Sequence, residues 1–220
     1  MGNTYTLDFL TDFKPMEHVL SYDMTDATFY SVDISAFDEP ATVNSPQGHT
    51  IANYGLTSYP TAPGNLVTGW PDGFNSYKTR VLAVYPNVVK LYYKFGAGAT
   101  ATPFANNITS SVTNPDYKNF AFTSAGDYQM RTSIWTNKIA DPAINWIFNS
   151  PANGIQRFSD IPAELTAKYP VLGTTTMSFD SNGFTKYLDG FTYEDYIQST
   201  MNVSTATKPF PTEYQMIAFY

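Results

Sequence analysis

The 220-residue sequence contains no cysteine and only two histidines. Without cysteine, disulfide bonds, thiolate metal sites and cysteine nucleophiles are excluded. Charged residues are also scarce, at 14% of the chain, where an average soluble protein has about 25%. The fold must therefore be stabilised by an apolar core and by hydrogen bonds, which a chain of this length can supply as one domain.

Long hydrophobic runs are missing as well. No stretch of the chain has the roughly 18 apolar residues of a membrane-spanning helix, and the start, MGNTYTLDFL, has neither a basic nor an apolar signal region. We therefore expect a protein made in the cytoplasm, without a transmembrane segment.

Gly2 and Thr6 match a myristoylation pattern, but no basic cluster follows to add a second membrane signal. The sequence leaves modification of Gly2 open.

Positive charge is almost absent from the first 77 residues, where Lys14 is the only base. The first 40 residues hold eight acids and one base, and the remaining 180 hold 11 of each, so the net charge of −7 belongs to the N-terminal segment. Complementary charged patches steer association. The sequence thus predicts an interface that includes Asp38, Glu39, Arg80, Lys90 and Lys94. Whether these charges pair between subunits or within one molecule stays open.

Alternating apolar and polar residues, the pattern of half-buried strands, recur along the chain. We expect strands over residues 4–10, 27–34, 79–85, 88–95, 120–122, 128–135, 144–148 and 214–220. Pro86-Asn87 indicates either a turn that makes a hairpin or a bend in one long edge strand. Asn182-Gly183 predicts a hairpin between 174–179 and 184–188, because both residues tolerate positive φ.

Helical patterns are few and short, at residues 15–21, 161–168 and 193–201. Two Gly- and Pro-rich or polar stretches, 38–77 and 96–116, read as long irregular loops. The expected fold class is mainly β: an antiparallel β-sandwich, jelly-roll-like, with long loops and two or three short helices. It should form one β-rich domain over residues 1–220.

One loop combines aromatic rings with polar side chains in a way that suits sugar recognition. Rings stack on sugar faces, and carboxylate and amide groups bond hydroxyls. The candidate ligand-binding residues are Trp70, Asp72, Phe74, Asn75 and Tyr77. The alternative is an aromatic loop that folds back on its own domain or docks on a neighbouring subunit.

The sequence indicates metal binding only through residue type and not through a recognised spacing. Asp23, Asp26 and Asp33 supply the hard oxygen ligands that Ca²⁺ prefers, but at no spacing typical of a calcium loop. A solvated acidic face is the alternative. Apart from possible calcium, no cofactor is expected.

Catalysis finds little support. The chain has no G-x-S-x-G elbow and no phosphate-binding loop, and only His18 and His49 could act as a histidine base. We therefore expect a protein that is not an enzyme.

Lys90, Tyr92 and Lys94 interleave in a manner seen in proteins that bind single-stranded nucleic acid. The sequence pI near 4.6 argues against nucleic acid as a partner, and lysines that protect an exposed sheet edge are the favoured interpretation.

These patterns favour a structural, self-assembling protein, a phage or viral virion component such as a capsid, decoration or tail subunit. Its partners would be copies of itself or other subunits, and its location the virion or another assembled particle. The alternative is a carbohydrate-binding module or lectin-like protein whose partners are glycans.

Overall fold

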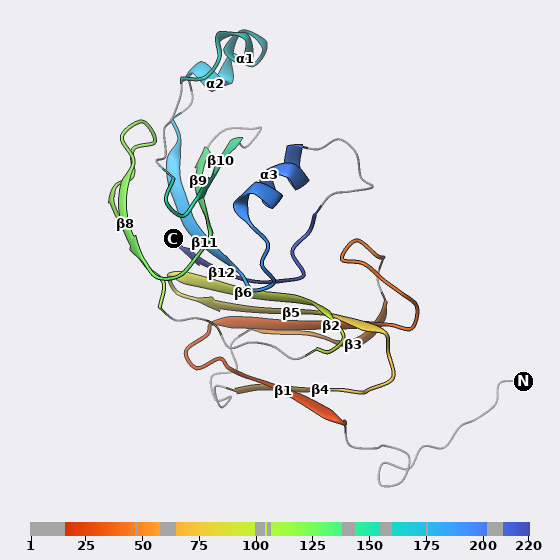
Figure 1. Cartoon of the computed structure of the whole chain (residues 1–220). Coiled ribbons are helices and arrows are strands. Elements are labelled where there is room, and N and C mark those ends of the chain that lie inside the picture. Colours follow the sequence, from red (N-terminus) through yellow and green to blue (C-terminus); the bar gives the residue numbers. More distant parts are fainter. Residues whose placement is uncertain are drawn as a thin grey trace, which may run out of the picture.

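The computed structural model describes residues 16–46, 48–57, 65–99, 104, 107–137, 144–154, 160–174, 176–201 and 209–220. Within these residues, eight strands form one antiparallel sheet. Its order is β10 (Ile144–Pro151), β9 (Met130–Asn137), β11 (Ser178–Tyr187), β12 (Glu213–Phe219), β6 (Val88–Gly96), β5 (Ser76–Tyr85), β2 (Phe29–Phe37) and β3 (His49–Thr57). The sheet is strongly bent between its two halves (Figure 1).

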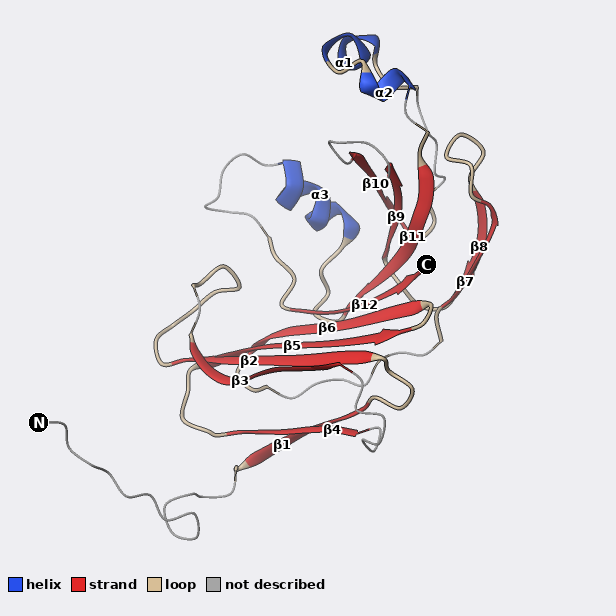
Figure 2. Ribbon diagram, turned by 180° about the vertical axis from the view of Figure 1, so that it is seen from behind, coloured by secondary structure: helices blue, strands red, loops and turns tan. Residues whose placement is uncertain are grey.

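Two small antiparallel sheets cover the outer side of this bend (Figure 2). β1 (His18–Asp23) pairs with β4 (Asn65–Trp70) and lies against the half that contains β6, β5 and β2. β7 (Thr109–Asn114) pairs with β8 (Ala121–Ala125) and lies against the other half. Of the helices in the described residues, α1 (Ala163–Lys168) and α2 (Val171–Thr174) lie beyond the end of β11, and α3 (Tyr193–Met201) lies on the inner side of the bend.

The core forms where the outer face of the large sheet meets these small sheets. Val32, Ile34, Val81 and Tyr92 point to this face and are fully buried. Leu20, Tyr22 and Leu66 from β1 and β4 pack against them. Strand alternation places every second residue of the central strands in this layer, which is how a low-charge chain builds its main apolar core.

The mainly β, antiparallel fold predicted from the sequence is confirmed, but a jelly-roll-like sandwich is not. Instead of two comparable sheets packed face to face, the described residues form one large open sheet with two small sheets against it. Pro86-Asn87 does form the turn between β5 and β6, and α3 begins and ends where the sequence predicts. Thr192 caps this helix, since its Oγ1 accepts a hydrogen bond from the backbone N–H of Asp195 at 3.1 Å.

Other local predictions were wrong. The helix expected at 15–21 is replaced, over residues 18–21, by β1. The segments 38–77 and 96–116, expected to be irregular, contain β3, β4 and β7. β4 is stabilised by a partner remote in sequence, β1, which its local Gly and Pro content did not reveal. β3 and β7 pair with the strands next to them along the chain, β2 and β8. The strand expected at 4–10 lies outside the described residues.

The hairpin predicted at Asn182-Gly183 was also wrong. The chain continues through both residues as β11, where Asn182 lies opposite Phe219 and Gly183 opposite Ala218. Asn182 is fully buried, and its Oδ1 accepts a hydrogen bond from Ser133 Oγ at 2.7 Å. Gly183 is not among the described glycines with positive φ. A buried hydrogen-bonding site, rather than a turn, explains the asparagine.

Replacing Gly183 by alanine tests this difference. An added Cβ would lie 3.6 Å from the Thr132 carbonyl oxygen and 3.9 Å from Ala218 Cβ, which is ordinary contact. Gly183→Ala should therefore leave the free energy of unfolding unchanged or raise it by about 0.4–1 kcal/mol, because alanine restricts the unfolded chain. Urea unfolding measures the effect.

Gly190→Ala is the matched control. Its added Cβ meets nothing within 4 Å, but the φ of +84° is strained for any side chain, so a loss of about 1–2 kcal/mol is expected. A similar loss at Gly183 would indicate the turn and contradict the strand.

Candidate functional site

The predicted sugar-stacking ring, Trp70, is not accessible for stacking. It is 5% exposed. The His18 ring stacks on it with centroids 4.0 Å apart, and Tyr77 meets it edge-on at 4.9 Å. Tyr77 is itself buried and donates its hydroxyl hydrogen to the carbonyl oxygen of Pro71. The two rings thus belong to the core.

The polar residues of the same loop are used within the molecule. Asp72 Oδ1 lies 2.7 Å from His18 Nε2, and Asn75 donates its side-chain N–H to the carbonyl oxygen of Asp38. Phe74 is half-buried against Tyr77. The structure brings the five predicted ligand residues together, but their contacts close the loop over the domain. This arrangement matches the alternative in which the loop folds back.

The charged residues predicted to form an interface are partly balanced inside the molecule. Arg80 on β5 lies beside Asp33 on the neighbouring β2, with Nη1 to Oδ2 at 3.6 Å. Asp38 Oδ2 lies 2.6 Å from His49 Nε2. The acidic and basic segments therefore meet in adjacent strands, and the uneven charge along the sequence does not by itself indicate a second subunit.

The three aspartates proposed for calcium do not form a site. Within the described residues, which include all three, no group of three or more acids or histidines could hold a metal ion. Asp23 Oδ1 accepts hydrogen bonds from Thr25 N and Oγ1, at 2.9 and 2.7 Å, and Asp33 faces Arg80. These partners fix the carboxylates in separate places.

The lysines of β6 do not protect an edge, because β6 lies between β12 and β5. Tyr92, between Lys90 and Lys94 along the chain, is fully buried and donates its hydroxyl hydrogen to Glu213 Oε1 at 2.8 Å. It offers no surface on which a base could stack.

A different surface emerges from the order of the strands. β10 is the terminal strand of the large sheet, and among the described residues no strand pairs with its outer side. Its sequence, INWIFNSP, has no charged residue, and Ile147 at its middle is 54% exposed. Eight consecutive positions pair with β9 without a register shift. The opposite edge strand, β3, shows a register shift against β2.

The edge of β10 is held rigidly. Trp146 stacks on Phe148 with centroids 5.6 Å apart. Asn149 donates its side-chain N–H to Tyr196 Oη at 2.7 Å, and its carbonyl oxygen accepts a hydrogen bond from Tyr193. Both tyrosines come from α3, which therefore fastens the end of β10. The site is a preformed strand on whose outer side no strand pairs among the described residues, and whose Asn149 carbonyl oxygen is bonded to Tyr193.

The sequence identified a strand at 144–148 but not its place at an edge, since strand order depends on pairings between remote segments. The usable signal was the absence of charge in this strand, because exposed edges are commonly protected by charged residues such as lysine.

No helix in the described parts of the chain is long and apolar enough to span a membrane. No family model matches the chain, and no match was found among curated proteins or solved structures.

Proposed function

We propose that this protein is a structural subunit that assembles with further copies of itself through β10. The observation that supports the proposal is that, in the part of the chain that the structure describes, no strand pairs with the outer side of this uncharged strand, which pairs with β9 without a register shift. Such an edge presents a row of unpaired N–H and C=O groups, which readily pair with a strand of another chain.

A second copy is the occupant that the composition of β10 favours. Two β10 strands can pair antiparallel about a two-fold axis, so that the same surface is used on both subunits. Since INWIFNSP carries no charge, no like charges meet across this pair. Exposed Ile147 adds apolar contact on the inner side of the bend.

The class of assembly that we propose is a virion component, such as a capsid, decoration or tail subunit. Low charge, a cysteine-free chain and a predominantly antiparallel β fold support this class. Each half of the bent sheet, covered by a small sheet, would act as a sandwich-like unit of the shell or tube.

Ile147→Lys tests the role of β10. In a two-fold pair the new lysines come close to each other, and the repulsion adds to the lost apolar contact. The expected result is self-association weakened at least about 10-fold, or about 1.4 kcal/mol, in sedimentation velocity across a concentration series. Because the wild-type pairing uses no ion pairs, it should persist at high salt.

Val19→Lys is the matched control. Val19 is 64% exposed on β1, which lies at the other end of the molecule from β10 (Figure 1). The Val19→Lys variant gains the same charge as Ile147→Lys but should associate like the wild type. A wild-type protein that is monomeric at every concentration and salt, or equal weakening by both variants, would contradict the proposal.

A further inference from the structure

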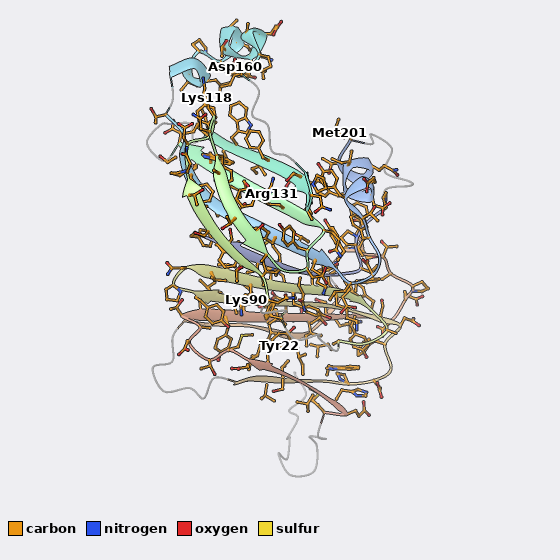
Figure 3. All side chains as sticks on the ribbon, turned by 60° about the vertical axis from the view of Figure 1, so that its left-hand side comes forward. Tyr22, Lys90, Lys118, Arg131, Asp160 and Met201 are labelled. Carbon is orange, nitrogen blue, oxygen red and sulfur yellow. The ribbon has the colours of Figure 1, made fainter. Side chains whose placement is uncertain are left out.

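A pocket of about 350 Å³ lies between β1 and the outer face of the large sheet. β1 and the turn after it contribute Ser21, Tyr22, Asp23 and Thr25. Tyr85 of β5, Lys90 of β6 and Phe104 complete the lining. Lys90 and Tyr22 lie close together on the facing layers (Figure 3). The pocket is distinct from the 69–77 loop and lies four strands away from β10.

Aromatic rings position the ammonium group of Lys90 at this pocket. Its Nζ lies 5.1 Å from the centroid of the Tyr85 ring and 5.9 Å from that of Phe104. Both distances are typical of cation–π contacts. Burial lowers the pKa of Lys90, while the negative charge of Asp23 acts in the opposite direction. A half-buried cation among rings interacts with an incoming anion more strongly than a solvated surface lysine does.

A carboxylate stands at the same pocket. Hydrogen bonds from Thr25 lower the pKa of Asp23, so this group is ionised at neutral pH. Both hydrogen bonds that the described residues donate to Asp23 go to Oδ1. Oδ2 can therefore accept a hydrogen bond from a ligand hydroxyl. The hydroxyls of Ser21 and Thr25 add further polar groups to the lining.

We propose that this pocket binds an acidic monosaccharide, a pyranose ring that carries a carboxylate. The ligand carboxylate would face Lys90, its hydroxyls would donate to Asp23, and the C–H surface of its ring would contact the aromatic wall formed by Tyr85 and Phe104. The volume is near the lower end for small-molecule sites, so one sugar residue is the fitting size. This site is independent of the assembly proposed through β10.

The test is calorimetric titration of the whole protein with glucuronate, with glucose as the uncharged comparison. Loss of a charge-assisted hydrogen bond corresponds to about 10-fold to 100-fold in affinity. Glucuronate is expected to bind at least about 10-fold more tightly than glucose, and Lys90→Gln should remove this preference while leaving the weak binding of glucose unchanged.

Lys94→Gln is the matched control, because Lys94 lies four residues further along the same face of β6 and its loss changes the net charge equally. It should bind glucuronate like the wild type. The far-ultraviolet circular dichroism of both variants checks that they fold. Absence of glucuronate binding at millimolar concentration, equal binding of glucose, or full binding by Lys90→Gln would overturn the proposal. Tighter binding of glycine than of glucuronate would overturn the sugar class, since it would indicate a site for a zwitterionic amino acid.

Discussion

Between pH 10 and pH 12 the protein should lose a large part of its stability. Burial raises the pKa of Tyr93 to about 12 and also raises the pKa values of Tyr22, Tyr187 and Tyr214 above 10. In the unfolded chain these phenols ionise near pH 10. A raised folded pKa contributes stability that is fully present below the unfolded pKa and is lost as the pH rises toward the folded one.

The size of this effect follows from proton linkage. Each tyrosine that stays protonated in the folded state costs about 1.4 kcal/mol for every pH unit above about 10. Because these rings keep part of their contact with solvent, Tyr22, Tyr93 and Tyr187 together remove on the order of 5 kcal/mol by pH 12, which is a large share of the stability of a typical domain, about 5–15 kcal/mol. Unfolding in this range is therefore expected to be cooperative.

Two signals recorded in one alkaline titration check the prediction. Phenolate absorbance of the buried tyrosines should rise together with the loss of circular dichroism, because these side chains ionise on unfolding. If the four tyrosines with raised pKa values ionised near pH 10 while the fold persisted, their burial would be contradicted.

Trp135→Ala is expected to have the largest effect of any single core substitution discussed. Trp135 is fully buried on β9, where Phe120 meets its ring at 4.7 Å and Phe148 at 5.6 Å. Its Nε1–H donates a hydrogen bond to the Pro115 carbonyl oxygen at 3.0 Å. Removal leaves a large cavity and an unpaired acceptor, so a loss of about 3–5 kcal/mol in the free energy of unfolding is expected.

Trp146→Ala provides a matched comparison, because Trp146 lies directly opposite Trp135 on the neighbouring β10. Its side chain is half-buried, so the same substitution should cost clearly less. Denaturant unfolding of both variants measures the difference. Equal losses would contradict this difference in burial between the two tryptophans.

Strands predicted from periodicity were found where their own residues carried a clear pattern. β6 shows how: apolar and polar residues alternate from Val88 onward, and Pro86-Asn87 marks the turn before it. Asn182-Gly183 shows the limit, because an Asn-Gly pair has the same sequence whether it turns or lies in a strand. Only the buried partners, Ser133 and the strands on either side, determine that β11 continues.

For the candidate sites too, the sequence indicated the residues, and the tertiary packing decided whether they are accessible. The sequence identified Trp70 and its loop as rich in rings and polar groups, but the covering His18 ring comes from a strand over 50 positions away. It likewise identified Lys90 as a charge for an interface, whereas its neighbours Tyr85 and Phe104 make it the wall of a pocket. Exposure depends on what packs above a residue, and local composition does not contain that information.

The sequence by itself determined the class of structure: a cysteine-free, low-charge, mainly antiparallel β chain with few helices, since alternation and composition act locally. The tertiary structure alone decided the order of the strands, the bend of the sheet and the position of β10 at its edge, because these depend on pairings between remote segments. It also decided that Asp33 of the acidic segment and Arg80 of the basic segment meet within one molecule.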